Sequence, residues 1–375
     1  MKILITDIFL RKTFDVVNIL LKHYDKKDFV FLSNNPRNLT KLKCTLFYQS
    51  SNLFLLRKNE NFNSDLKKIS LFFSDEKLVY LPIEEDTTLL FLSFLQSNTV
   101  SSNFFYLLPE TDTFLLSRDK EKLNAFCERN AIPCPKLITH IDFKNNNFSL
   151  PVIVKPKIGS GSKRIFYIET EKDLLQLNFD SSQNFIQEKL PSSRSVEGGF
   201  YLCDNGEILS FYSHKRIRTF PKKGGVTVFS EATNSEQIKI AGQKIIEKLN
   251  WSGLIMIEFI FDERDEKYKL IEINPRMWGS ILLSEECGSN LLQNYVELVK
   301  GNSIKESYFS KTYIRWIFPY DFLFFLKNPS NPFRFFSSPK HTIHVNFTYS
   351  SFFRSFFFLL ITYFNFAKIL HILKK

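Results

Sequence analysis

Three oxygen-bearing side chains between residues 258 and 274 have the spacing of a metal site. In the run 269–280, KLIEINPRMWGS, Glu272 and Asn274 lie on the same face of an alternating strand that stops at a proline. Glu258 lies fourteen residues before Glu272, in the strand-like run 253–261. The charged segment DERDEKY between the two runs is typical of a turn, so we expect a hairpin that brings Glu258 beside Glu272. Two carboxylates and a carboxamide are hard oxygen donors, which suit a Mg²⁺ ion that also holds nucleotide phosphates.

Basic and glycine-rich positions elsewhere in the chain complement these acids. Arg276 follows the strand directly and is available for an anionic group. Lys155 ends a strand-like run and Lys120 lies near the start of a helix, so each offers a compact positive charge to a phosphate. A loop after Lys155 has glycines that let backbone N–H groups approach phosphates closely. This loop consists of Gly159, Ser160, Gly161 and Ser162.

The first hundred residues have the pattern of a parallel α/β sheet. Residues 2–8 and 28–36 read as strands, and 14–24 has helical apolar spacing between them. The run 77–95 continues with a strand, a loop and a helix, and 104–109 is expected to be the last strand of this sheet. No GxGxxG motif follows the first strand, so no dinucleotide site is inferred there. Pro82, Glu84 and Glu85 follow the strand in 77–95, at the place where open α/β sheets bind ligands.

The middle of the chain mixes helices with hairpins. Residues 117–136 predict a helix that begins near Ser117 or Asp119 and ends before Pro133. The sequence DNG at 204–206 is a strong turn signal between two strands. The remaining expected elements are a hairpin over 150–169, a strand over 184–190, a hairpin over 195–219 and an amphipathic helix over 234–250 capped by Ser235.

Five short motifs together resemble the ATP-grasp superfamily, in the type of carbamoyl phosphate synthetase and biotin carboxylase. They are IVKP (153–156), GSGS (159–162), IQEKLP (186–191), MIEF (256–259) and IEINPR (271–276). The resemblance covers about 117–301 and implies an α/β chain with an α+β core. It implies a Rossmann-like pre-ATP-grasp domain over 1–112 and an ATP-grasp domain over 113–303, followed by a basic, Phe-rich extension over 304–375. The ATP-grasp domain would divide into subdomains 113–186 and 187–303.

The resemblance also implies roles for individual residues, with ATP and Mg²⁺ as cofactors and Mn²⁺ as an alternative metal. Lys120, Lys155 and the 159–162 loop would bind the phosphates, and Glu258, Glu272 and Asn274 would hold the metal. The hinge that reads adenine would be Gln187, Glu188, Lys189 and Leu190, with Glu188 contributing its side chain. Relatives often carry an acidic ribose ligand at the position of Ser195, so Glu197, two residues further, is the candidate here.

The implied reaction is the activation of a carboxylate as an acyl-phosphate, which an amine or another nucleophile then attacks. Arg276, Lys155 and Arg218 are the candidate catalytic residues, and Arg276 would hold the acceptor carboxylate or the acyl-phosphate. In the basic run 215–232, Arg216 and Arg218 alternate onto one strand face. This run is either a cationic funnel for ATP or a solvated basic loop, and the two interpretations weigh equally.

Other interpretations of the same residues remain open. Isolated strand glutamates are most often solvent-facing and paired with Lys or Arg, and only the shared face and the NPR motif argue against that here. A carboxylase or carbamoyl-phosphate-forming enzyme is one alternative. The other is a nucleotide-binding scaffold at the membrane surface that has lost turnover. Small-molecule carboxylates and nucleophiles are the expected partners, without nucleic acid.

The net charge and the cysteine content indicate where in the cell the protein acts more than which reaction it catalyses. The net charge is +11, and the segment 308–375 holds nine Lys or Arg residues against one acid, Asp321. Five scattered cysteines do not suggest a zinc site or a disulfide framework, and no signal peptide is recognised, which favours the cytoplasm. The run 352–375 has thirteen uncharged residues between Arg354 and Lys368, too few to span a bilayer. It fits a helix packed on the body or at a homodimer interface, or a peripheral contact with the inner face of the membrane.

Overall fold

A computed structural model describes most of the chain and divides it into two compact units. The first comprises 1–108 and 276–375, and the second comprises 109–275. The sequence instead predicts a middle domain that ends at 303. The difference arises because the segment after Pro275 packs on the N-terminal sheet, where Tyr295 donates a hydrogen bond to the Tyr80 carbonyl (3.0 Å). The described residues are 1–8, 10–33, 53–55, 62–97, 103–145, 147–159, 164–177, 179–221, 225–327 and 337–345.

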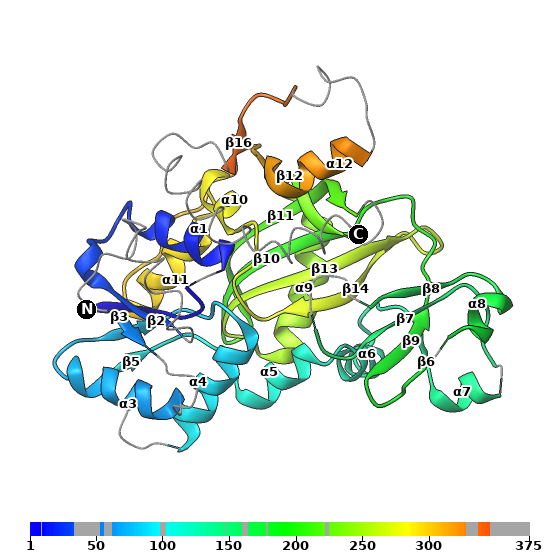
Figure 1. The fold of residues 1–375 in the computed structure, drawn as a ribbon, viewed down its shortest axis with the longest axis horizontal. Coiled ribbons are helices and arrows are strands. Elements are labelled where there is room, and N and C mark those ends of the chain that lie inside the picture. The colour runs from blue at the N-terminus through cyan, green and yellow to red at the C-terminus, as the bar shows by residue number, and fades with distance from the viewer. Residues whose placement is uncertain are drawn as a thin grey trace. The chain divides into compact units, whose positions relative to one another are not determined.

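The first unit contains a five-stranded parallel sheet in the order β3-β2-β1-β4-β5, which confirms the predicted α/β pattern. Helices α3 and α4 cover one face and α1 the other (Figure 1). Apolar side chains of β1, β2 and β4 pack with those of α3 and α4 to form its core. The elements are β1 (Lys2–Ile5), α1 (Arg11–Leu20), η1 (Lys26–Asp28), β2 (Phe29–Ser33), β3 (Leu53–Leu55), α3 (Phe62–Phe72), β4 (Leu78–Tyr80), α4 (Glu85–Ser97) and β5 (Phe104–Phe105).

The rest of this unit follows Pro275. It consists of α10 (Ile281–Glu286), α11 (Leu291–Lys300), β15 (Tyr313–Arg315), the π-helical turn η3 (Ile317–Asp321), α12 (Phe322–Lys327) and β16 (Thr342–His344). Arg315 is buried and pairs with Asp321 (2.6 Å). Among the described helices, none has the length and apolar character needed to cross a bilayer. The predicted helix in 352–375 lies outside the described residues.

The second unit begins with two helices and a small sheet. The chain passes from α5 to α6 at Asp119, whose carboxylate accepts hydrogen bonds from the N–H groups of Glu121 and Lys122 (both 3.1 Å). Asp119 is therefore the N-cap, while Ser117 belongs to the preceding helix. The small sheet has the order β6-β9-β7-β8 and contains the predicted 150–169 hairpin as β7 and β8. The elements are α5 (Thr111–Arg118), α6 (Lys120–Arg129), β6 (Leu137–Ile138), α7 (His140–Lys144), β7 (Val152–Pro156), β8 (Phe166–Ile168), α8 (Glu171–Leu175) and β9 (Asn184–Glu188).

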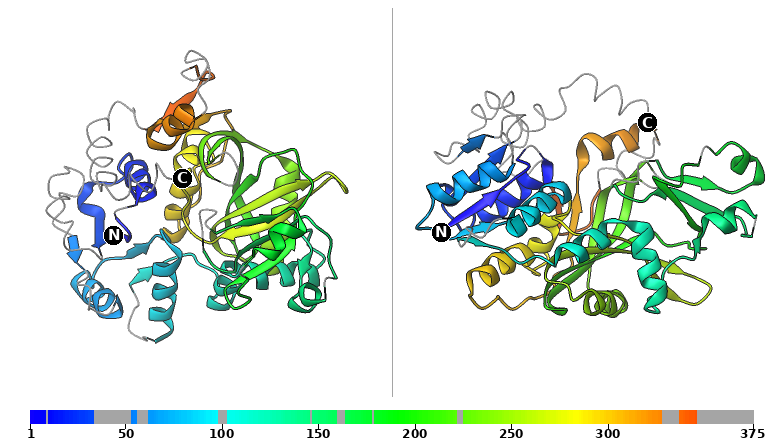
Figure 2. Two further views of the ribbon diagram at one scale, coloured as in Figure 1. Left: turned by 45° about the vertical axis from the view of Figure 1, so that its right-hand side comes forward. Right: turned by 90° about the horizontal axis from the view of Figure 1, so that it is seen from below.

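Long antiparallel strands form the second sheet of this unit (Figure 2). Within this unit their order is β14-β13-β10-β11-β12. The predicted DNG turn joins β10 to β11, with Asn205 at φ 47° and Gly206 at φ 82°. Both residues take the left-handed conformation that two-residue hairpin loops require. The helix α9 packs against β10, β11 and β14, and Ser235 caps it as predicted. The elements are β10 (Glu197–Asp204), β11 (Glu207–Phe220), β12 (Val226–Thr233), α9 (Glu236–Leu249), β13 (Gly253–Asp262) and β14 (Lys267–Asn274).

The contact between α9 and this sheet leaves no room for a side chain at Gly242. A Cβ there would lie 2.0 Å from the Tyr201 hydroxyl oxygen, which donates a buried hydrogen bond to the Ile238 carbonyl (2.8 Å). We expect Gly242→Ala to lower the free energy of unfolding by about 1–3 kcal/mol, because the helix or the tyrosine must move. Urea unfolding of the full chain measures this. The exposed Gln243→Ala is the control, and equal stability of the two variants would contradict the packing described here.

Candidate active site

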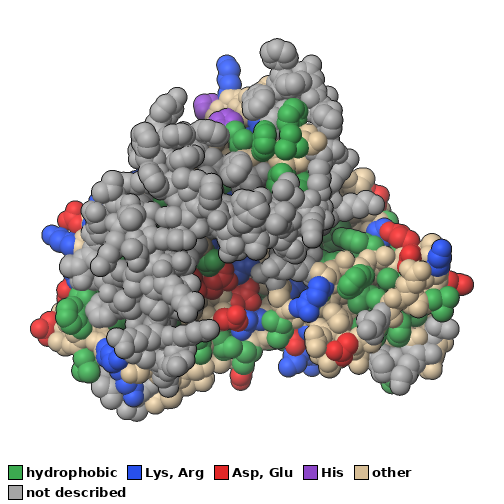
Figure 3. Space-filling view, viewed as in Figure 1, with side chains coloured by type: hydrophobic (Ala, Val, Ile, Leu, Met, Phe, Trp, Pro, Cys, Tyr) green, Lys and Arg blue, Asp and Glu red, His purple; other side chains and the backbone are tan. Residues whose placement is uncertain are grey.

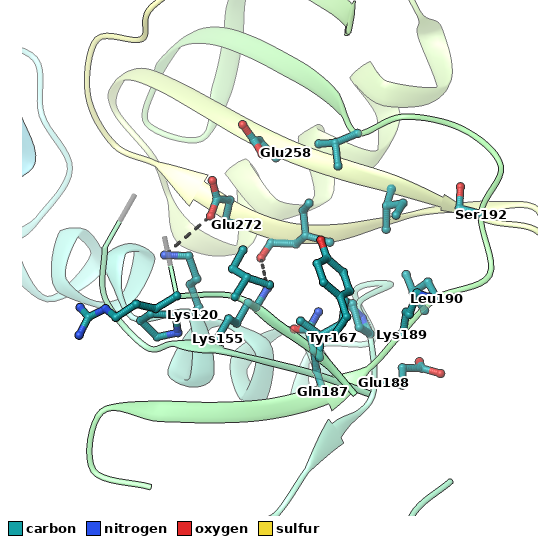
Figure 4. Close-up of a pocket in the computed structure, with 18 of the residues that line it drawn as sticks. Lys120, Lys155, Tyr167, Gln187, Glu188, Lys189, Leu190, Ser192, Glu258 and Glu272 are labelled. Carbon is teal, nitrogen blue, oxygen red and sulfur yellow. Dashed lines mark hydrogen bonds and ion pairs between the residues drawn. The ribbon is translucent and has the colours of Figure 1, made fainter. Parts of the chain in front are cut away.

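A cavity of about 480 Å³ lies between the two sheets of the second unit. Its volume is in the range of small-molecule sites. One wall comes from β7, β8 and β9 and the other from β11, β13 and β14 (Figure 4). Hydrophobic side chains are also visible on the surface over the small sheet (Figure 3). The apolar residues of the cavity include Ile153, Tyr167, Leu190, Ile260 and Ile271.

The predicted hairpin forms and places Glu258 directly opposite Glu272. The two residues are register partners in the β13–β14 pairing, and a register shift follows immediately after Glu258. Directly opposed residues of an antiparallel pair project from the same face, so both carboxylates line the cavity (Figure 4). Asn274 donates a hydrogen bond to Glu272 (3.3 Å) but is not among the lining residues.

Both predicted lysines reach this cavity. The Lys155 ammonium donates to the Ile271 carbonyl (3.2 Å) and lies 5.3 Å from the centre of the Phe185 ring. Burial lowers the pKa of Lys155 to about 8, although the Glu272 carboxylate acts in the opposite direction. Lys120 donates to the Gly159 carbonyl (2.5 Å) and lies 3.7 Å from Glu272. The cavity therefore presents two ammonium groups beside two carboxylates.

Of the residues that the structure describes, Arg216 lines the cavity and Arg218 does not. Arg216 donates to the Glu258 carboxylate at 2.5 Å. Arg218 lies over the Phe229 ring, 5.7 Å from its centre. A register shift between the two arginines in the β11–β12 pairing interrupts the alternation that was predicted to place both on one face. The cation that contacts a predicted metal ligand is thus Arg216, which was predicted as part of the basic run but not as a catalytic residue.

Arg216 competes with a divalent cation for the Glu258 carboxylate, because it donates to one of the carboxylate oxygens. We therefore expect Arg216→Gln to strengthen the binding of Mn²⁺ alone about threefold to tenfold, since a competing positive charge is removed. Electron paramagnetic resonance of free Mn²⁺ measures this in the absence of nucleotide. Arg218→Gln is the matched control and should leave the affinity unchanged. Weaker Mn²⁺ binding in Arg216→Gln would show that Arg216 does not compete with the cation.

The four predicted hinge residues lie at the end of β9 or directly after it and line the cavity, and two of their side chains have partners within the protein. Glu188 accepts from the Lys136 backbone N–H (2.8 Å) and pairs with Arg264 (2.9 Å). Lys189 pairs with Glu169 at 2.5 Å. Backbone groups of this segment are therefore better placed to read a base than the Glu188 carboxylate. The hinge residues are Gln187, Glu188, Lys189 and Leu190.

The remaining predicted site residues lie elsewhere. Glu197 is buried and accepts from the Tyr268 hydroxyl (2.9 Å), and it is not a lining residue. Ser192 does line the cavity and offers a hydroxyl near the hinge (Figure 4). Of the glycine-rich loop only Gly159 is described, and Ser160, Gly161 and Ser162 lie outside the described residues.

Arg276 belongs to the first unit and is engaged there. Its Nε lies 3.0 Å from Glu85 and 3.6 Å from Glu84, and its Nη1 donates to the Met277 carbonyl (3.0 Å). The arginine after the metal strand thus meets the acidic pair that was predicted at the exit of the strand in 77–95.

The donor set in the cavity fits a hard divalent cation with phosphate oxygens. Glu258 and Glu272 supply two carboxylates on one face, and phosphates would complete the oxygen coordination. In the part of the chain that is described, no group of three or more His, Cys, Asp or Glu side chains could hold a metal without such a ligand. The ammonium groups of Lys120 and Lys155 would offset the phosphate charge. The arrangement therefore suits a metal–polyphosphate complex better than a metal alone.

Comparisons with known proteins show which family and which proteins this chain resembles. A family model described as an ATP-grasp domain matches residues 117–280. A carbamoyl-phosphate synthase of Methanobrevibacter smithii is 25% identical over 211 residues, which are 51% of this chain and 55% of that protein. A D-aspartate ligase of Enterococcus faecium is 24% identical over 221 residues, 52% of each chain. This chain therefore spans about half the length of these curated relatives.

Solved structures share the fold at low identity. N5-carboxyaminoimidazole synthetase of Staphylococcus aureus in complex with ADP has a TM-score of 0.62 and 16% identity, with 83% of this chain and 81% of that chain covered. The biotin carboxylase domain of Hydrogenobacter thermophilus 2-oxoglutarate carboxylase, in complex with MgADP and bicarbonate, has a TM-score of 0.61 and 13% identity. That comparison covers 83% of this chain and 73% of the other. At these identities the likeness establishes the fold.

Proposed function

We propose that this chain, whose residues 117–280 match the model of an ATP-grasp domain, is an ATP- and Mg²⁺-dependent ligase that activates a carboxylate as an acyl-phosphate. An amine or another nucleophile then takes the acyl group. The observation that carries the proposal is the register pairing of Glu258 with Glu272 in the same cavity as Lys120 and Lys155. The ADP bound to the staphylococcal enzyme and the MgADP bound to the carboxylase domain support the choice of nucleotide.

Different residues of the cavity have different roles in the first step. Glu258 and Glu272 would hold Mg²⁺, which spreads the charge of the transferring phosphoryl group when bound. Lys120 and Lys155 would bind phosphate oxygens, while the apolar wall and the hinge backbone would hold the base. An oxygen of the substrate carboxylate attacks the γ-phosphorus. The bond from that phosphorus to the bridging oxygen breaks, and ADP leaves.

The second step transfers the acyl group. The nucleophile attacks the acyl carbon, and the carbon–oxygen bond to phosphate breaks. For an amine, the nitrogen loses a proton, and inorganic phosphate leaves with the electron pair. The name of the enterococcal relative, D-aspartate ligase, supports a nitrogen nucleophile over other kinds.

Phosphate release from ATP and Mg²⁺ in the presence of pooled carboxylates and amines tests the proposal. We expect release to require one member of each pool and to form one ADP for each phosphate. ATP binding without acceptor-dependent release from any pool would instead support the nucleotide-binding scaffold.

Bicarbonate activation is the second candidate. The relative named carbamoyl-phosphate synthase and the bicarbonate in the carboxylase-domain structure favour it. In that case bicarbonate alone, without any member of the carboxylate pool, would support ADP formation. Adding bicarbonate to the same assay therefore distinguishes the two activities.

A further inference from the structure

Buried polar atoms without a hydrogen-bond partner gather on β11 and β12 in the second unit. In the described part of the chain, they include both ring nitrogens of His214, Nε of Arg216 and the hydroxyl oxygen of Ser230. His214 and Ser230 are almost fully buried, with 2% and 0% of their surface exposed. Leaving a buried polar atom without a partner costs free energy, so a group of them points to a partner in another state of the site. We call these three residues the polar cluster.

The strand register places the polar cluster on the cavity face of the sheet. Arg216 and Ser230 are register partners in the β11–β12 pairing, and His214 lies two positions before Arg216 on β11. Directly opposed residues share a face, and so do residues two apart on a strand. The side chains of His214 and Ser230 therefore project on the same side as Arg216, whose guanidinium lines the cavity and donates to Glu258.

A glycine lets the His214 imidazole extend toward the strand of Glu258. Gly198 on β10 is the register partner of His214 on one side and of Glu258 on the other. A Cβ atom at Gly198 would lie only 3.0 Å from Nε2 of His214, so the imidazole fills the space that a side chain would take there. The imidazole thus lies over β10, between its own strand and the strand that carries Glu258.

His214 and Ser230 are suited to accept hydrogen bonds from the guanidinium. Burial, together with the charge of Arg216, lowers the pKa of His214 to about 3, so the imidazole is neutral at neutral pH and keeps one nitrogen as an acceptor. The Ser230 hydroxyl oxygen can also accept, and Nε of Arg216 is a donor without an acceptor among the described residues. A turn of the Arg216 side chain would therefore satisfy the donor and the acceptors together.

A divalent cation at Glu258 would favour this turn. The cation and Arg216 compete for the same carboxylate, and a guanidinium released from Glu258 would find acceptors in His214 and Ser230. The Arg216 side chain is 14% exposed at the cavity, so its remaining N–H groups would stay available to a ligand there. A guanidinium binds a planar carboxylate with two parallel hydrogen bonds, which makes a carboxylate the best ligand for it.

This position suits the carboxylate that is to be phosphorylated. That carboxylate must lie next to the γ-phosphate on the metal, and Arg216 already contacts a proposed metal ligand. The phosphates have their own cations in Lys120 and Lys155. Arg276, which the sequence predicted for the carboxylate, belongs to the first unit and pairs there with Glu85.

We propose that Arg216 binds the carboxylate substrate, and that His214 and Ser230 are positioning residues that hold its guanidinium once a divalent cation occupies Glu258. This inference rests on the proposed function, because it assigns the ligand of the carboxylate in the same reaction. It predicts that metal and nucleotide bind before the carboxylate, since Arg216 otherwise stays paired with Glu258.

Formate is the probe, because the smallest carboxylate fits a carboxylate site whatever the full substrate is, and formamide is its uncharged counterpart. Paramagnetic relaxation of ¹³C-labelled formate by Mn²⁺, bound with ADP to the full chain, reports formate near the metal without turnover. We expect saturable binding in the millimolar range, as is usual for so small a ligand, and at least about tenfold weaker binding of formamide. Without ADP and with a diamagnetic chain free of metal, calorimetry should show weaker binding of formate.

The decisive variant is Arg216→Gln, which should weaken formate binding at least about tenfold. Lys215→Gln removes the neighbouring charge on the opposite face of β11, where the side chain is exposed, and should leave formate binding unchanged. Arg216→Gln is also expected to strengthen Mn²⁺ binding, and misfolding cannot change the two affinities in opposite directions. Equal binding of formate by Arg216→Gln and by the unchanged chain would overturn the proposal.

Paired substitutions test the two positioning residues. His214→Phe and Ser230→Ala remove an acceptor, and each should weaken formate binding about threefold to tenfold. His214→Gln and Ser230→Thr keep an acceptor and should recover most of the affinity. Urea unfolding of all four variants shows whether each is folded at the assay temperature. Folded variants that lose affinity without this recovery, or that lose none, would remove His214 and Ser230 from the positioning role.

The outcomes separate this proposal from the proposed function. Calorimetry first measures the binding of ADP with Mn²⁺. If this complex binds but formate does not, or if formamide binds as tightly as formate, the assignment of Arg216 is wrong while the nucleotide site stands. If ADP does not bind, the proposed function fails, and the relaxation experiment with Mn²⁺ alone decides the assignment of Arg216.

Discussion

Glu272→Gln is expected to lower acceptor-dependent phosphate release by about a hundredfold to a thousandfold. Glu272 is a register partner of Glu258 and lies 3.7 Å from Lys120, so it touches both the proposed metal position and a proposed phosphate ligand. Gln keeps the size of the side chain and removes its charge. The loss would therefore come from a weaker metal contact with the transferring phosphoryl group. Single-turnover phosphate release at saturating ATP measures it.

Two additions make this test specific. Glu247→Gln changes an exposed acid on α9 that accepts from Gln243, and its rate should equal that of the unchanged chain. Raising the Mg²⁺ concentration should recover part of the rate in Glu272→Gln if the lost contact is to the metal. Full turnover in Glu272→Gln at low Mg²⁺ would remove Glu272 from the metal site.

The hairpin that carries this site was predictable because its signals are local. Alternation in each strand and a charged turn fix which residues pair, and a register error of one residue would have turned every side chain to the other face. Glu258 and Glu272 lie within a segment of fewer than twenty residues, so few alternative pairings compete. The same reasoning explains why the DNG turn at 204–206 was found correctly.

The choice between Arg216 and Arg218 was not predictable in this way. Perfect alternation would place both on one face, but the register shift between them leaves Arg216 on Glu258 and Arg218 over Phe229. A shift of this kind depends on how two strands fit their neighbours, and no residue type in the run 215–219 signals it. The partners of Glu188 could not be predicted either, because Lys136 and Arg264 come from distant positions in the sequence.

The sequence pointed to Glu84, Glu85 and Arg276 separately but did not predict that they meet. Glu84 and Glu85 were expected at a ligand-binding strand end, and Arg276 was expected to bind an anion. The contact between Arg276 and Glu85 joins residues 191 positions apart in the chain, and it forms because the segment after Pro275 belongs to the same unit as the N-terminal sheet. Lys12, which also contacts Glu84, carried no signal at all, because a lysine in the first turn of an amphipathic helix is ordinarily solvated.

Lys155→Ala is expected to weaken the binding of a non-hydrolysable ATP analogue with Mg²⁺ about tenfold to hundredfold. The buried ammonium of Lys155 has one carbonyl partner, Ile271, and a phosphate would replace that neutral acceptor by a charged one. Lys157→Ala removes a neighbouring ammonium that pairs with Glu121 and should leave the affinity unchanged. Equal affinities of the two variants would exclude Lys155 from the phosphate site.

The pH dependence of this binding gives a second readout. The pKa of Lys155 is lowered by burial from 10.5 to about 8, so in the free protein the side chain loses its charge as the pH rises through about 8. Affinity for the analogue should therefore fall above this pH. Lys155→Arg, which stays charged, should remove the fall. Because burial also lowers the pKa of Lys12 to about 8, Lys12→Arg is the control and should keep the fall.

The lowered pKa of Lys155 also predicts that its contribution to stability rises with pH while the affinity for the analogue falls. Measuring both quantities therefore separates a loss of binding from unfolding. Between pH 8 and 10.5 the unfolded chain holds a proton on Lys155 that the folded chain has released. The unfolded state binds more protons there, so the contribution of Lys155 to the free energy of unfolding rises with pH across this window. Urea unfolding of the unchanged chain and of Lys155→Met across this window measures it. Affinity that falls with pH while this contribution rises identifies deprotonation of Lys155 as the cause of the lost binding, whereas a parallel fall in both would attribute it to unfolding.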